Sequence, residues 1–193
     1  MSPRMNLDSN IVLQKAVELI DEKGLDQLSI SLLAKELNIR PPSLYNHVNS
    51  LSELKQALAI QGLHKLHQYM MKAAIGKSGD EAIRSISKSY VQFVREHPGL
   101  YDATNRFTHS EDIELQQAQK MIVDLVLQVF EFYHLQQDMA IHMVRGLRSI
   151  LHGFTSIEQM GGFGIPLNLD DSLSILINTF IEGIHSVARS TTD

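Results

Sequence analysis

The chain has 193 residues, of which 44% are hydrophobic and 20% charged, so it can bury a sizeable core and is not disordered by composition. It has no cysteine, which excludes disulfides, cysteine-based zinc sites and a cysteine nucleophile. Its net charge of -5 at pH 7 excludes a nucleic-acid binder that relies on bulk positive charge alone.

The first residues, MSPRMNLDSN, lack the apolar core of a signal peptide, so we expect a cytoplasmic protein. No apolar run approaches the roughly 18 residues that a membrane-spanning helix needs, so we expect no membrane partner. Apolar residues recur at helical spacing through most of the chain, without strand alternation. This pattern predicts an all-α fold of about nine helices.

Local signals place the first four helices. An apolar stripe predicts a helix over 9–23, which Gly24 ends. Ser29 is suited to cap a short second helix, and Asn38 follows it where a tight turn needs a left-handed residue. The prolines at 41 and 42 predict the start of a third helix over 41–47. The capping box formed by Ser50 and Glu53 starts a long fourth helix toward residue 75.

Later breaks predict helices over 80–97, 98–105, 110–133, 137–160 and 170–188, with a loop at 161–166. The fold prediction is therefore a three-helix N-terminal domain over 6–63, joined by a long helix to a larger helical domain over 80–188. The segment 29–48 is the most informative part of the first domain. Its apolar residues should face inward and hold two short helices across a tight turn: Leu33, Ala34, Leu37, Ile39 and Leu44.

Such a pair of helices is typical of a helix-turn-helix, whose second helix enters the major groove of DNA. Outward-facing Ser43, Tyr45, Asn46 and His47 carry groups that hydrogen-bond to base edges or phosphates. The methylenes of the two prolines suit a thymine methyl, and Arg40 and Lys35 suit flanking phosphates. The alternative is a plain helical hairpin in which Tyr45 and His47 cap a core.

The same segment resembles the TetR family of repressors, through Leu28-Ser29, Leu33-Ala34, Leu37, Asn38-Ile39, Ser43-Leu44-Tyr45 and His47-Val48. This resemblance implies a regulator that binds a palindromic operator as a homodimer. Two residues depart from the family pattern: Leu51 stands where many members have lysine, with Lys55 one turn later, and Asn38 replaces glycine. The predicted DNA-binding residues are Ser29, Ser31, Lys35, Arg40, Pro41, Pro42, Ser43, Tyr45, Asn46, His47 and Lys55.

The region after residue 80 is rich in methionine and aromatic residues, which suit either an ordinary core or a cavity for a small apolar or amphipathic effector. With the family resemblance, we expect an effector pocket lined by Phe93, Tyr101, Phe107, Met121, Phe130, His142 and Met143. The segment Leu151-His152-Gly153-Phe154 is similar to the Trp-His-Gly element of one TetR-type C-terminal domain. Leu151 replaces its tryptophan.

Small residues on the helix over 137–160 would let another helix approach closely, and the last helix has a matching apolar stripe. The family resemblance implies that these two helices of each subunit form a four-helix dimer interface. The residues expected there are Gly146, Ser149, Gly153, Ile177, Phe180 and Ile184. The alternative is that both helices bury these faces within one chain. An effector is expected to shift residues 51–75 and so change the spacing of the two reading helices.

The sequence has no phosphate-binding glycine loop, no HExxH and no GxSxG, so we expect no enzyme and no cofactor. His64 and His67 share a helix face, but no third ligand accompanies them, so we expect no metal site. A helical partner-binding protein of the same fold that has lost DNA binding is the remaining alternative, which the acidic balance and Leu51 permit.

Overall fold

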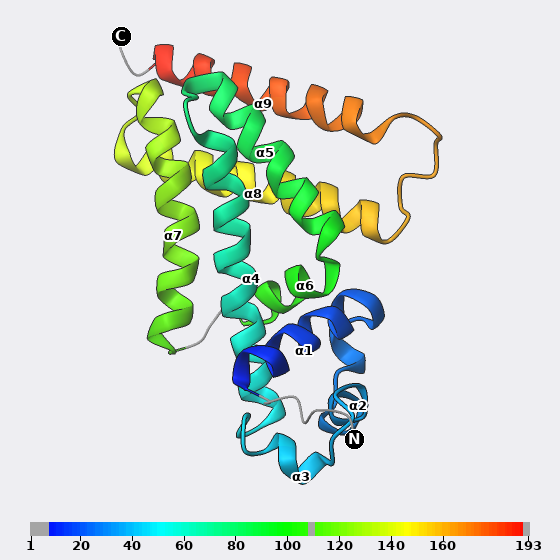
Figure 1. The fold of residues 1–193 in the computed structure, drawn as a ribbon. Coiled ribbons are helices and arrows are strands. Elements are labelled where there is room, and N and C mark those ends of the chain that lie inside the picture. Colours follow the sequence, from blue (N-terminus) through cyan, green and yellow to red (C-terminus); the bar gives the residue numbers. More distant parts are fainter. Residues whose placement is uncertain (1–7, 108–110, 191–193) are drawn as a thin grey trace. The chain divides into compact units, whose positions relative to one another are not determined.

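The computed structural model describes residues 8–107 and 111–190, and within these ranges every regular element is a helix. In chain order they are α1 Ser9–Lys23, η1 Leu25–Gln27, α2 Ile30–Glu36, α3 Pro41–Leu44, α4 Leu51–Ala74, α5 Gly79–Glu96, α6 Pro98–Arg106, α7 Ile113–Phe130, η2 Glu131–Tyr133, α8 Gln137–Gln159 and α9 Leu169–Ser190. Figure 1 shows this order along the chain. The predicted all-α fold of about nine helices is confirmed, with nine α-helices in the described ranges.

None of the helices in the described ranges is both long enough and apolar enough to cross a membrane. The described residues form two compact units, which we treat separately. The first consists of the chain up to His64 together with Glu96–Ala118, and the second consists of Lys65–Arg95 with the chain from Gln119 onward. Helix α6, which the sequence analysis assigned to the larger domain, is part of the first unit.

In the first unit, α1 contacts α2 and α6, and α2 contacts α3. The predicted stripe on α1 is buried, with Val12 and Ala16 fully enclosed. Asp8 caps α1 by accepting a hydrogen bond from the Ile11 amide at 2.8 Å. These contacts hold the short α2 and α3 against a longer helix, which isolated helices of their length need for stability.

In the second unit, the inner faces of α5, α8 and α9 form the core. Phe93 of α5 is fully buried and meets Tyr69 of α4 edge-on, with ring centroids 5.6 Å apart. Phe130 at the end of α7 lies beside Phe180 of α9, with ring centroids 6.5 Å apart. Packing of the apolar faces of these helices against one another stabilises this unit.

Candidate nucleic-acid interface

Helix α2, the first helix of the predicted helix-turn-helix, begins and ends as its local sequence predicts. The Ser29 hydroxyl accepts a hydrogen bond from the Leu32 amide at 3.2 Å, which caps α2. Asn38 has a φ of 55°, so it supplies the left-handed residue of the turn. The Ile39 amide then donates to the Ala34 carbonyl at 3.0 Å, which closes the end of α2.

Helix α3 is shorter than predicted, since it ends at Leu44 rather than at residue 47. Pro41 and Pro42 occupy its first positions, where a missing amide hydrogen costs nothing. The next residues continue as a turn, in which the His47 amide donates to the Leu44 carbonyl at 2.9 Å. Leu44 is fully buried and is the inward anchor of the segment, while its neighbours on both sides face outward.

Most of the predicted DNA-binding residues are exposed on the surface of the first unit. Tyr45 is 54% exposed. The other exposed members of the predicted set are Ser31, Lys35, Arg40, Pro41, Pro42, Ser43 and Asn46. Ser29, His47 and Lys55 are half-buried, and the Ser29 hydroxyl is already engaged as the α2 cap.

The lysine and arginine side chains in the described part of the first unit fall into two groups. Lys15, Lys23 and Arg106 each pair with carboxylates, as in the Lys23–Glu36 pair at 3.2 Å between α1 and α2. By contrast, Lys35, Arg40 and Lys55 form no ion pair or hydrogen bond with any residue in the described ranges. Lys35, Arg40 and Lys55 are therefore not neutralised by an acidic side chain of the described residues.

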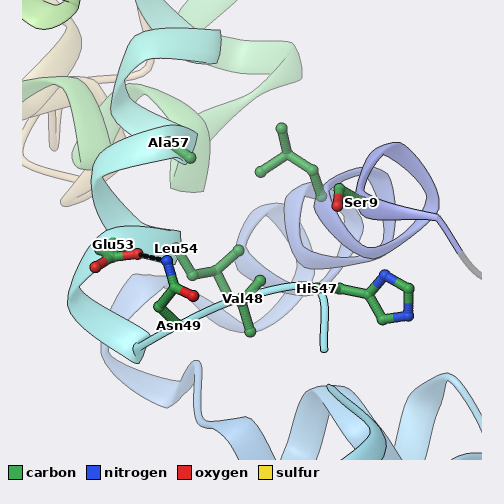
Figure 2. A pocket seen from close by; sticks show the side chains of 8 residues that line it. Ser9, His47, Val48, Asn49, Glu53, Leu54 and Ala57 are labelled. Carbon is green, nitrogen blue, oxygen red and sulfur yellow. Dashed lines mark hydrogen bonds between the residues drawn. The ribbon is translucent and has the colours of Figure 1, made fainter. Parts of the chain in front are cut away.

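A hollow of about 180 Å³ lies between the start of α1 and the segment that joins α3 to α4 (Figure 2). Its lining residues are Ser9, Leu13, His47, Val48, Asn49, Glu53, Leu54 and Ala57. The Asn49 side-chain amide donates to the Glu53 carboxylate at 2.7 Å, and the Glu53 amide donates to the Ser50 hydroxyl at 3.1 Å. These bonds fix the first turn of α4 beside His47.

Sequence reasoning missed the residues that attach α6 to α1. The Asp21 carboxylate accepts from the Leu100 amide at 2.9 Å and meets His97 Nδ1 at 2.8 Å, so it caps α6 from another helix. A Cβ built on Gly99 would lie 2.0 Å from the Ile20 carbonyl oxygen, which shows how closely the two helices approach. No local signal identifies this cap, because His97 and Leu100 lie 76 and 79 residues after Asp21 in the sequence.

The predicted effector-pocket residues do not share one unit. Tyr101 and Phe107 belong to the first unit, and the other five belong to the second. Within the second unit Phe93 and Phe130 are buried, whereas Met121 is 38% exposed and His142 faces solvent. The exposed position of His142 separates it from the buried aromatic residues.

Some of the predicted dimer residues are buried within their own chain and others are exposed. Ile177 and Ile184 are 3% and 0% exposed, so they pack in the core of their own chain. A Cβ built on Gly146 would lie 3.2 Å from the Phe180 ring, so this glycine also faces its own chain. Ser149 is exposed, and a Cβ on Gly153 or Gly183 would meet no atom within 4 Å. The exposed apolar residues from α8 to α9 are Ile157, Met160, Phe163, Ile165, Leu167, Ile175 and Leu176.

Known proteins share both halves of this architecture. The family described as bacterial regulatory proteins, tetR family, matches residues 12–58, and that described as tetracyclin repressor-like, C-terminal domain, matches residues 83–180. The HTH-type transcriptional regulator YobS of Bacillus subtilis is 38% identical over 185 residues, which cover 95% of this chain and 96% of that protein. The second description does not name the Trp-His-Gly type, so that subtype stays a prediction.

Two further similarities concern a tetracycline repressor protein and a solved structure of the same fold. The class D tetracycline repressor protein of Escherichia coli is 38% identical over 87 residues, which are 45% of this chain and 38% of that protein. The crystal structure of TetR from Acinetobacter baumannii AYE matches with a TM-score of 0.72 at 17% identity, covering 95% of this chain and 99% of that one.

A capped α2, a left-handed turn and an exposed α3 define a helix-turn-helix DNA-binding protein. The chain belongs to the TetR family of transcriptional regulators. It is therefore a DNA-binding regulator, and the alternative of a partner-binding protein without DNA binding is not favoured. The members of this family are transcriptional regulators rather than enzymes.

Proposed function

We propose that this chain is a ligand-responsive repressor that binds a palindromic operator as a homodimer. The observation that carries the DNA-binding surface is the exposed segment from Pro41 to His47, flanked by three cations that have no partner among the described residues. Tyr45, Asn46 and Ser43 read base edges or phosphates, and Lys35, Arg40 and Lys55 hold the backbone. A protein that acts on chromosomal DNA works in the cytoplasm, which we propose as its location.

The homodimer forms through the exposed surface of α8 and α9. Ser149 and Gly153 on α8 and Gly183 on α9 allow another helix to approach closely, and Ile175 and Leu176 add apolar area. This surface replaces Ile177 and Ile184 of the sequence-based set, since those two side chains are occupied in the core. Two-fold symmetry then places the two reading helices roughly 34–36 Å apart, one turn of DNA.

A small apolar or amphipathic effector binds among the aromatic residues of the second unit and lowers the affinity for the operator. Helix α4 has residues in both units, so a shift of α4 transmits the change. The attachment of α6 to α1 through Asp21 supplies a second connection, because α6 follows directly after α5. The similarity to tetracycline repressors supports a drug-sized effector but does not identify it.

A gel-shift titration with DNA from upstream of the gene tests this function. Tyr45→Ala should abolish specific binding while the dimer remains intact, because the ring is exposed and supports no core contact. Tyr45→Phe removes only the hydroxyl, so it tests the contribution of the hydroxyl to binding separately from that of the ring. Phe132→Ala is the matched control, since Phe132 is 55% exposed but lies in the second unit. Full operator binding by Tyr45→Ala, or loss of its dimer, would contradict the proposed role of Tyr45.

A further inference from the structure

Polar side chains pair across the contact between α5 and α9, which we call the seam. The two helices are antiparallel there, so residue numbers rise along α5 as they fall along α9. The Asp80 carboxylate meets His185 Nε2 at 2.9 Å. One turn later Arg84 donates to the Asn178 side-chain oxygen at 2.8 Å, and near the end of α5 Arg95 pairs with Asp170 at 2.8 Å. The seam therefore has three polar connections, each with a matched partner.

Lys88 interrupts this series. It follows Arg84 by one turn and shares a hollow of about 140 Å³ with Ser174 of α9. The Ser174 hydroxyl donates to the Asp170 carbonyl at 2.7 Å within its own helix. Lys88 has no ion pair or hydrogen bond to any residue of the described ranges. An ammonium group is thus left at the hollow without an acidic partner.

The charged residues that line this hollow are all cationic. Its residues are Arg84, Lys88, Leu173, Ser174, Ile177 and Asn178, with two cations and no carboxylate. Because the Asn178 oxygen accepts from Arg84, its amide nitrogen remains available to donate. Leu173 and Ile177 are each 3% exposed and give the hollow an apolar floor. Asp80 is the carboxylate near Arg84, at 3.6 Å, and it is already bonded to Tyr133 and His185.

The residues that line the hollow differ from those of the sites proposed above. At about 100° per residue, Ser174 and Asn178 lie on one flank of α9 and Leu176 and Gly183 on the other, with the buried Ile177 between the flanks and the exposed Ile175 on the outer face. The lining shares no residue with the proposed DNA-binding set or with the proposed dimer surface, so this site goes beyond the proposed function.

We propose that this hollow between α5 and α9 binds a small organic carboxylate. The carboxylate lies against Arg84, Lys88 and the Asn178 amide, and a short apolar body covers Leu173 and Ile177. Charge-assisted hydrogen bonds from guanidinium and ammonium groups favour the anion, and the apolar floor favours an organic acid over inorganic phosphate. A neutral ligand of the same shape lacks the first of these interactions.

Methyl NMR on the full-length protein tests the site, with sodium benzoate as the probe and the methyl groups of Leu173 and Ile177 as the reporters. Benzoate should shift both signals saturably. Benzamide and inorganic phosphate should bind at least tenfold more weakly. Lys88→Gln should weaken benzoate binding about tenfold, as expected for the loss of one charge-assisted hydrogen bond.

Lys72→Gln is the matched control, since Lys72 is an exposed lysine of the same unit that does not line the hollow. It should leave the benzoate titration unchanged. Equal binding of benzamide would show a purely apolar site, and equal binding of phosphate would show a general oxyanion site. Either result, or an unchanged titration with Lys88→Gln, overturns the proposal, and none of them bears on operator binding.

Discussion

Gly99 shows how a single residue fixes the contact between two helices of the first unit. It follows Pro98 in the first turn of α6, where a Cβ would come within 2.0 Å of the Ile20 carbonyl oxygen and 2.8 Å of the Asp21 amide nitrogen. Both neighbours are backbone atoms of α1, so rotation of a side chain cannot make room. Gly99 therefore permits the cap that Asp21 provides for α6.

Gly99→Ala should lower the free energy of unfolding by about 1–3 kcal/mol, because α6 must move away from α1 to accommodate the methyl group. Chemical denaturation followed by circular dichroism measures this loss. Gly164→Ala is the control, since a Cβ there meets no atom within 4 Å. Equal stability of the two variants would show that α6 does not depend on the close approach.

Most helix bounds could be predicted because their signals are local. Ser29, Asn38 and Ser50 act within a few residues of their own position, and α1 has the bounds that the stripe and Gly24 predict. Helix α3 was predicted too long because a one-turn helix followed by a further turn has no stop residue to mark its end. The helical spacing nevertheless identified Leu44 as the inward residue and Ser43, Tyr45 and Asn46 as outward residues, whereas His47 is half-buried.

The apolar face of α9 shows what spacing alone cannot decide. Periodicity identified Ile177 and Ile184 as apolar positions on one face, but it does not say whether that face meets its own chain or a partner. The structure places both side chains in the core, and the open surface lies around Gly183 on the adjoining flank. The Asp21 cap and the seam between α5 and α9 depend on residues far apart in sequence, so no local pattern reveals them.

At the scale of elements, a polar cluster joins α5, η2 and α9. The Tyr133 hydroxyl donates to Asp80 at 2.6 Å, and His185 meets the same oxygen at 2.9 Å. Burial raises the pKa of the Tyr133 hydroxyl, and the Asp80 carboxylate raises it further, so Tyr133 stays a donor. Burial alone would raise the pKa of Asp80, but hydrogen bonds from Tyr133 and His185 outweigh it, and the net shift is downward.

A carboxylate whose pKa is lowered on folding stabilises the folded state above its unfolded pKa, and this contribution is lost as the pH falls through the folded pKa. The stability advantage of the wild type over Asp80→Asn should therefore be full near pH 6 and shrink below about pH 4. Thermal unfolding across this range measures it. Tyr133→Phe should show a smaller version of the same trend, and a difference that stays constant with pH would contradict the account.

At the scale of the whole molecule, dimerisation through α8 and α9 should require the exposed apolar residues of α9, Ile175 and Leu176. Ile175→Lys should shift the protein toward the monomer in sedimentation velocity, because burial of an ammonium group in an interface is costly. Operator affinity should fall with it, since a single subunit binds one half-site only. Ile113→Lys is a close control, because Ile113 is 70% exposed and Ile175 is 68% exposed.

Because Asp21 closes the first turn of α6, the reading module cannot be excised cleanly at the end of α4. A fragment that stops there leaves the carboxylate of Asp21 and the backbone around Ile20 without the groups that cover them in the intact protein. Chimaeras that exchange DNA specificity between relatives should therefore take α1 and α6 from the same parent, so that the graft has three junctions rather than one.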